Sequence, residues 1–141
     1  MATVVVDANL VVSLITPDER RDSVRTLFAA WTVDGTGLAA PPHFYAEVLS
    51  TLRRKVFRGQ ITPEEGETAV RFYFSLVLTR ESPPALQPLA WQLAKDFNLP
   101  TTYDTEYMAL ARLLACEFYT ADERFVRSLG AAKPDWVRFI A

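Results

Sequence analysis

The sequence predicts an α/β fold in which helices cover both faces of a parallel sheet. Short apolar segments alternate with amphipathic helical segments, and turn residues separate them. The first apolar segment, residues 4–6, is β-branched on both faces, which is typical of a strand covered on two sides. The chain has 141 residues, 50% of them hydrophobic, and no linker or repeat, so we expect one domain over residues 1–141.

Four segments have the composition of short strands. They are residues 4–6, 38–40, 118–120 and 136–140, the last of them an edge strand. Because helical segments separate them along the chain, they are expected to pair in parallel through right-handed crossovers.

Six helices are expected between and after these strands. The first begins at a capping box, Thr16 to Glu19, and has an apolar face at Val24, Phe28 and Trp31. Two other helices begin at similar boxes, at Thr62 and at Thr120. The six helical segments start near residues 17, 43, 63, 89, 104 and 121.

Charge and cysteine content limit the possible functions. With 15 Lys and Arg against 17 Asp and Glu, the net charge is −2, which argues against a protein that holds nucleic acid by charge alone. A protein with this net charge could still hold the phosphates of a nucleic acid through a metal ion. One cysteine, Cys116, allows no intramolecular disulfide and sits in an apolar segment, so a cytoplasmic location is expected. Neither a secretory signal nor a run long enough to span a membrane is expected.

Four acidic residues stand out because each lies beside apolar residues at a strand end or a helix start. Asp7 follows the first strand, Asp122 follows the strand at 118–120, and Glu47 and Asp104 lie near helix starts. Ligands of open α/β sheets bind beyond the carboxyl ends of the strands, where the strand order reverses. Carboxylates gathered there repel one another, and a hard divalent cation such as Mg²⁺ relieves the repulsion.

Each of these acids also has a simpler interpretation when taken alone. Asp104 or Asp7 could be a helix or turn cap, Asp122 could be an acid in a first helical turn, and Glu47 could be a solvated residue. These interpretations explain the joint pattern poorly.

Four segments resemble the acidic motifs of PIN domains, and most closely those of VapC-type toxins of toxin–antitoxin pairs. They are VVVDAN (4–9), AEVL (46–49), YDTEYMALA (103–111) and TADERF (120–125). The resemblance implies a three-layer α/β/α sandwich with a central parallel five-stranded sheet. It also implies a ribonuclease that depends on Mg²⁺ or Mn²⁺, forms a homodimer and is inhibited by a small antitoxin protein.

By this resemblance Asp7, Glu47, Asp104 and Asp122 form the catalytic acidic quartet. Asp7 and Asp104, with Asp122, are the expected metal ligands, and Glu47 and Asp122 are expected to act partly through water. Ala8 departs from the family, since many members have Thr or Ser there. Asn9 and Thr120 remain as polar neighbours and are expected to contact substrate.

The basic residues of the helix that starts near residue 43 suggest how an acidic protein could approach RNA. Glu47, Thr51, Arg54 and Arg58 follow one another along a single stripe of that helix. We expect Arg54 and Arg58 to contact phosphates. A solvated helix face is the alternative. His43, one turn before Glu47, is expected to have a structural role at the helix start, although a role in acid–base chemistry stays open.

Residues 72–74 are three consecutive aromatics in a helix, and one helix face cannot bury all of them. Core packing on one side and a subunit or antitoxin contact on the other is expected. A helix buried all round is the alternative.

Two other function classes are alternatives, a phosphotransfer protein on a similar sheet and a non-catalytic binding module. A phosphatase of the haloacid dehalogenase type would have D-x-D after the first strand, where this chain has Asn9, and a receiver domain would have paired acids there. A non-catalytic PIN-like binding module is the remaining alternative, and the presence of all four acids speaks against it.

Overall fold

A computed structural model describes residues 2–141 and contains one parallel sheet of five strands. The strands are β1 (Thr3–Val6), β2 (Gly37–Ala40), β3 (Thr79–Arg80), β4 (Glu117–Thr120) and β5 (Val137–Phe139). Their order across the sheet is β3-β2-β1-β4-β5. In the register of the central strands, Val5 pairs with Ala39 on one side and with Phe118 on the other. The strand order therefore reverses between β1 and β4.

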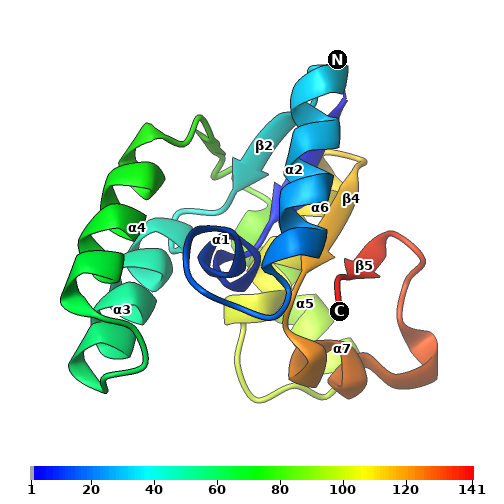
Figure 1. Cartoon of the computed structure of the whole chain (residues 1–141). Helices are drawn as coiled ribbons and strands as arrows, with labels where there is room; N and C mark the ends of the chain where they lie inside the picture. The colour runs from blue at the N-terminus through cyan, green and yellow to red at the C-terminus, as the bar shows by residue number, and fades with distance from the viewer. Residues whose placement is uncertain (1) are drawn as a thin grey trace.

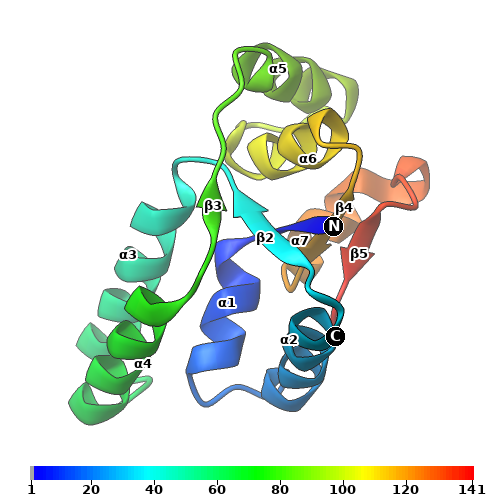
Figure 2. The ribbon, with the colours of Figure 1, turned by 90° about the horizontal axis from the view of Figure 1, so that it is seen from above.

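Seven α-helices connect these strands in the described chain. They are α1 (Ala8–Ile15), α2 (Arg21–Asp34), α3 (Phe44–Phe57), α4 (Pro63–Ser75), α5 (Leu86–Asp96), α6 (Tyr103–Leu113) and α7 (Glu123–Leu129). Helices α1 and α2 lie on one face of the sheet, and α5 and α6 lie on the other (Figure 2). Helices α3 and α4 pack side by side beyond the β2–β3 edge (Figure 1). The expected three-layer α/β/α class is confirmed.

The core lies on both faces of β1. Val5 and Val6 are fully buried, as the β-branched segment predicts. Leu10 and Val11 of α1 and Met108 of α6 are fully buried as well. The packed centre of the sheet therefore holds β1 and β4, with the residues that follow them, in fixed positions.

The expected capping box at Thr16 is wrong. Thr16 ends α1 instead of starting a helix, because its hydroxyl donates to the Val12 carbonyl at 2.7 Å. The next helix, α2, starts four residues after Pro17, at Arg21. Helix α1 was not expected, because nearly all of its residues are buried and it lacks the apolar–polar alternation of a surface helix.

The box expected at Thr120 is also wrong, whereas the one at Thr62 is confirmed. Thr62 and Glu65 exchange the two reciprocal hydrogen bonds of a capping box at the start of α4. Helix α7 is capped by Asp122 instead of Thr120. Strand β3 was not expected from composition, because it consists of two exposed polar residues.

No helix within residues 2–141 combines the length and the apolar character needed to cross a membrane.

Candidate active site

Two acids lie at the carboxyl ends of β1 and β4, the adjacent strands at which the strand order reverses. Asp7 caps α1, and its Oδ1 accepts a hydrogen bond from the Leu10 amide at 2.8 Å. Asp122 caps α7 in the same way, accepting from the Phe125 amide at 3.0 Å. The two caps fix the directions of both carboxylates at one edge of the sheet.

Thr120 links these two acids. Its hydroxyl donates to Oδ2 of Asp7 and accepts a hydrogen bond from the Asp122 amide at 2.9 Å. The residue is fully buried. Thr120 therefore positions Asp7 and Asp122, and its expected contact with substrate stays a prediction.

Asp104 reaches the same region from α6, on one face of the sheet, and Glu47 reaches it from α3, beyond the β2–β3 edge. Asp104 lies inside the first turn of α6, where Thr102 is the N-cap, so the interpretation of Asp104 as a cap is wrong. Glu47 lies in the first turn of α3. Its Oε1 accepts a hydrogen bond from the Tyr107 hydroxyl of α6 at 3.3 Å, so Glu47 is held and is not a free surface charge.

His43 also holds Glu47. Its Nε2 lies 2.8 Å from Glu47 Oε1, and its Nδ1 lies 3.8 Å from Glu106 Oε2. Burial alone would lower the pKa of His43, but the hydrogen bond and charge of Glu47 and the charge of Glu106 outweigh it and raise the pKa. Sequence reasoning missed Glu106, although it follows Asp104 by two residues.

Burial and the charges of neighbouring acids raise the pKa values of Asp7 and Asp104. Burial raises the pKa of Asp7 to about 7, and the charges of Asp104 and Asp122 add to this, while hydrogen bonds from Thr120 and Leu10 oppose it. Burial also raises the pKa of Asp104 to about 6, together with the charges of Asp122 and Glu47. The charge of Asp122 thus reaches both Asp7 and Asp104, and without a cation these two buried acids resist ionisation.

The donor set suits a hard divalent cation. All four acids offer carboxylate oxygens, and Mg²⁺ typically takes one or two protein carboxylates together with water and phosphate oxygens. Among residues 2–141, no three acid, His or Cys side chains are arranged to ligate one ion jointly. The residues therefore fit an ion that is only partly coordinated by protein and leaves positions for water and substrate.

Two clefts open beside the cluster. The first, with a volume of about 370 Å³, is lined by Asp104 and Asp122 and also by Arg124. Arg124 is exposed and places a positive charge next to two acids, as phosphate binding requires. Sequence reasoning missed it, although it stands two residues after Asp122.

The second cleft, of about 270 Å³, lies on the α3 side of the cluster and contains Glu47 and Arg54. Arg54 therefore shares a cleft with Glu47, and its contact with phosphate stays a prediction. Arg58 is exposed at the end of α3 and does not line this cleft. Asn9 is exposed in the first turn of α1, next to Ala8, and its contact with substrate stays a prediction.

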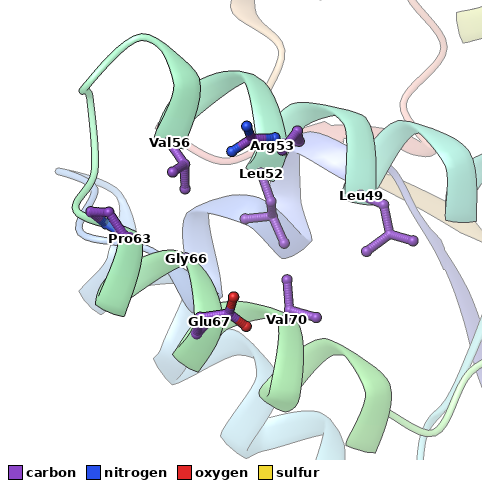
Figure 3. Close-up of a pocket in the computed structure, with 8 residues that line it drawn as sticks. All are labelled: Leu49, Leu52, Arg53, Val56, Pro63, Gly66, Glu67 and Val70. Atoms are coloured by element: carbon purple, nitrogen blue, oxygen red, sulfur yellow. The ribbon is translucent and has the colours of Figure 1, made fainter.

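An apolar groove of about 370 Å³ between α3 and α4 lacks these features. Leu52 and Val56 point from α3 toward α4, and Val70 points back toward α3 (Figure 3). The only charged residues lining the groove are Arg53 and Glu67, so it offers no group of carboxylates for chemistry.

Comparisons with known proteins show which family the chain resembles. The model of the PIN domain family matches residues 4–128. Ribonuclease VapC3 of Mycobacterium tuberculosis is 32% identical over 130 residues, covering 92% of this chain and 89% of the relative. VapC ribonuclease Mb0985 of Mycobacterium bovis is 30% identical, covering 86% of this chain and 87% of the relative.

Solved structures show the same fold. The crystal structure of VapC20 from Mycobacterium tuberculosis, described as a toxin that cleaves the sarcin–ricin loop, superposes with a TM-score of 0.65 at 19% identity and covers 96% of this chain and 98% of that chain. PAE2754 from Pyrobaculum aerophilum superposes with a TM-score of 0.63 at 17% identity and covers 90% of this chain and 79% of that chain. The chain belongs to the PIN domain family, and within it to the VapC-type proteins.

Proposed function

We propose that this protein is an endoribonuclease that depends on a divalent metal ion and serves as the toxin of a toxin–antitoxin pair. One observation carries the proposal. Asp7, Asp104 and Asp122 lie close together at the strand reversal, where burial, and then the charge of Asp122, raises the pKa of both Asp7 and Asp104. The ribonuclease names of the VapC relatives support RNA as the substrate.

Asp7 and Asp104 would hold the ion, Mg²⁺ or Mn²⁺, directly, and Asp122 would hold it partly through water. When bound, the ion supplies charge neutralisation at the scissile phosphate and makes a water molecule more acidic. Thr120 keeps Asp7 oriented, because its hydroxyl donates a hydrogen bond to Oδ2 of Asp7. Arg124 lies in the cleft beside Asp104 and Asp122 and would bind a phosphate oxygen.

Glu47 would orient the attacking water and accept its proton. His43 and Tyr107 both contact its Oε1, which leaves the other carboxylate oxygen available. A base held by two partners keeps its direction during the reaction, and a positioned base typically contributes ~10²- to 10⁴-fold to the rate.

The toxin assignment implies two protein partners. A small antitoxin is expected to bind the protein and block cleavage, as the VapC relatives suggest. A second copy of the chain is expected at α4, where Tyr73 is buried while Phe72 and Phe74 are 51% and 69% exposed. This exposure rules out a helix buried all round and leaves an apolar surface of the kind that forms interfaces.

Cleavage of RNA by the purified protein tests the proposal. Wild-type protein should cut single-stranded RNA in Mg²⁺ and lose the activity in EDTA, and Asp104→Asn should reduce the rate at least about 100-fold. Asp34→Asn is the matched control. Asp34 is an exposed acid at the end of α2, just before β2 starts, whereas the acidic cluster lies where the strands end. Full activity of the Asp104→Asn protein, or no activity of folded wild type on any RNA, would count against the enzyme and favour a binding module.

A further inference from the structure

The cleft on the α3 side of the acidic cluster combines features that neither the metal nor the phosphates need. It is lined by His43, Ala46, Glu47, Ser50, Thr51, Arg54 and Tyr103. Tyr103 is the first residue of α6, directly before Asp104, and its side chain is 63% exposed. An aromatic ring that is largely open to solvent is thus fixed next to a candidate catalytic residue.

The ring of Tyr103 is supported from within the protein. The His43 ring lies 5.8 Å from it between centroids, at an interplanar angle of 57°. His43 is itself held by Glu47 and lies 4.9 Å from the Tyr107 ring, so the support does not move freely. One side of Tyr103 therefore rests on a fixed group while much of the ring stays exposed. A tyrosine has only two side-chain torsions, so holding it for a ligand costs little conformational entropy.

The remaining residues of the cleft suit the polar parts of a nucleotide. The Arg54 guanidinium is positioned by the Thr51 hydroxyl, with 3.4 Å between Nη2 and Oγ1, and it supplies the positive charge. Ser50 and Thr51 supply hydroxyl groups. The cleft volume of about 270 Å³ is just below the ~300–1,000 Å³ of sites for drug-sized ligands, so it suits one planar base and not a duplex.

We propose that this cleft binds one unpaired nucleobase of single-stranded RNA by stacking it on Tyr103, with Arg54 on the adjoining phosphate. Sequence-specific proteins usually read RNA through splayed bases stacked on aromatic side chains. Because Tyr103 adjoins Asp104, the bound nucleotide is the one that flanks the scissile phosphate. Arg124, which lines the other cleft next to Asp104, then contacts the strand on the far side of the cut. The inference rests on the proposed ribonuclease function for the position of the cut, but not for the stacking.

Fluorescence of a single-stranded RNA carrying 2-aminopurine tests the stacking. All variants carry Asp104→Asn so that the RNA is not cut during titration. The otherwise unchanged protein and Tyr103→Phe should quench the probe on binding. Tyr103→Ala should bind about 5- to 100-fold more weakly and without this quenching, as base–aromatic stacking predicts. Trp91→Ala is the matched control, because Trp91 is 64% exposed on α5 and lines neither cleft.

Equal affinity and equal quenching with Tyr103→Ala would overturn the inference. The inference would also be overturned if Tyr103→Ala weakened the binding of a duplex of the same sequence as much as that of the single strand, because a paired base cannot stack on the ring. Failure of wild-type protein to cut RNA would refute the proposed function alone, since the fluorescence experiment does not depend on cleavage.

Discussion

Asp7 shows how one side chain can serve both the fold and the site. Its Oδ1 caps α1, while its Oδ2 accepts a hydrogen bond from Thr120. The simpler interpretation of Asp7 as a cap and its interpretation as a member of the acidic cluster are thus both correct. Asp122 also serves both, but as the cap of α7 and not as the acid inside the first turn that the simpler interpretation gave.

Asp7→Asn should change how stability depends on pH in metal-free protein. Burial raises the folded-state pKa of Asp7 from 3.8 to about 7, so the folded state binds this proton more tightly than the unfolded state. The stabilisation is complete below about pH 4 and is lost as the pH rises toward 7. Asparagine keeps the cap and has no charge to bury. At pH 8 the variant should therefore be more stable, with a free energy of unfolding about 1–3 kcal/mol higher than that of wild type.

Urea unfolding in EDTA at pH 5 and pH 8 measures this difference, with Asp34→Asn as the control. A pH dependence in Asp7→Asn as steep as that of wild type would show that Asp7 does not carry the buried charge.

Thr120→Val should impair activity more than its small change in shape suggests. Valine fills the same buried volume but leaves Asp7 Oδ2 and the Asp122 amide without their partner. Such a loss typically costs ~1–3 kcal/mol of stability. The value of kcat should fall with little change in KM, and Thr120→Ser, which restores the hydroxyl, should recover most of it. Equal kinetics for Val and Ser would show that the hydroxyl does not position the acids.

At the scale of elements, strands and helices were predictable from the sequence wherever the apolar residues recur at a regular spacing. The β1 segment and the capped helix α4 are in this group. Helix α1 was missed because an almost fully buried helix has no polar face to reveal its period. The Thr16 box was misassigned because the same hydroxyl can cap the start of one helix or bond back into the end of another.

The packing of α3 against α4 gives a prediction at this scale. A methyl group added at Gly66 would lie 2.5 Å from Val56 Cγ2. Valine is stiff in a helix, so the helices must shift apart. Gly66→Ala should therefore destabilise the protein by about 1 kcal/mol, although alanine alone would favour the helix.

The double variant Gly66→Ala with Val56→Ala tests the cause by thermal unfolding. It should be more stable than Gly66→Ala alone, because the clash is removed. Strictly additive losses would mean that the two side chains do not interact.

At the scale of the whole molecule, the convergence of the acids follows from topology. Parallel strands end at the same edge, so Asp7 and Asp122 were predictable from their positions after two apolar strands. The contacts of Glu47 with His43 and Tyr107 were not predictable, because they depend on how α3 and α6 meet across that edge. Arg124 and Tyr103 escaped notice since each is an exposed residue with an ordinary surface explanation.

The exposed aromatics of α4 give a prediction about assembly. Phe74→Asp should produce a folded monomer in sedimentation experiments, where wild type is expected to sediment as a dimer, because a buried charge opposes an apolar interface. Val33→Asp, at a residue that is 86% exposed on α2, should leave the dimer intact. A Phe74→Asp protein that still sediments as a dimer would place the interface elsewhere.

Calorimetric titration of metal-free protein with Mg²⁺ at pH 8 tests the central claim that these acids form one cation site. Wild type and Asp34→Asn should bind the ion with the same affinity. Asp104→Asn should bind it at least about tenfold more weakly, since it loses a carboxylate ligand. Folded wild-type protein that takes up no Mg²⁺, or an Asp104→Asn protein that binds it as well as wild type, would contradict the account.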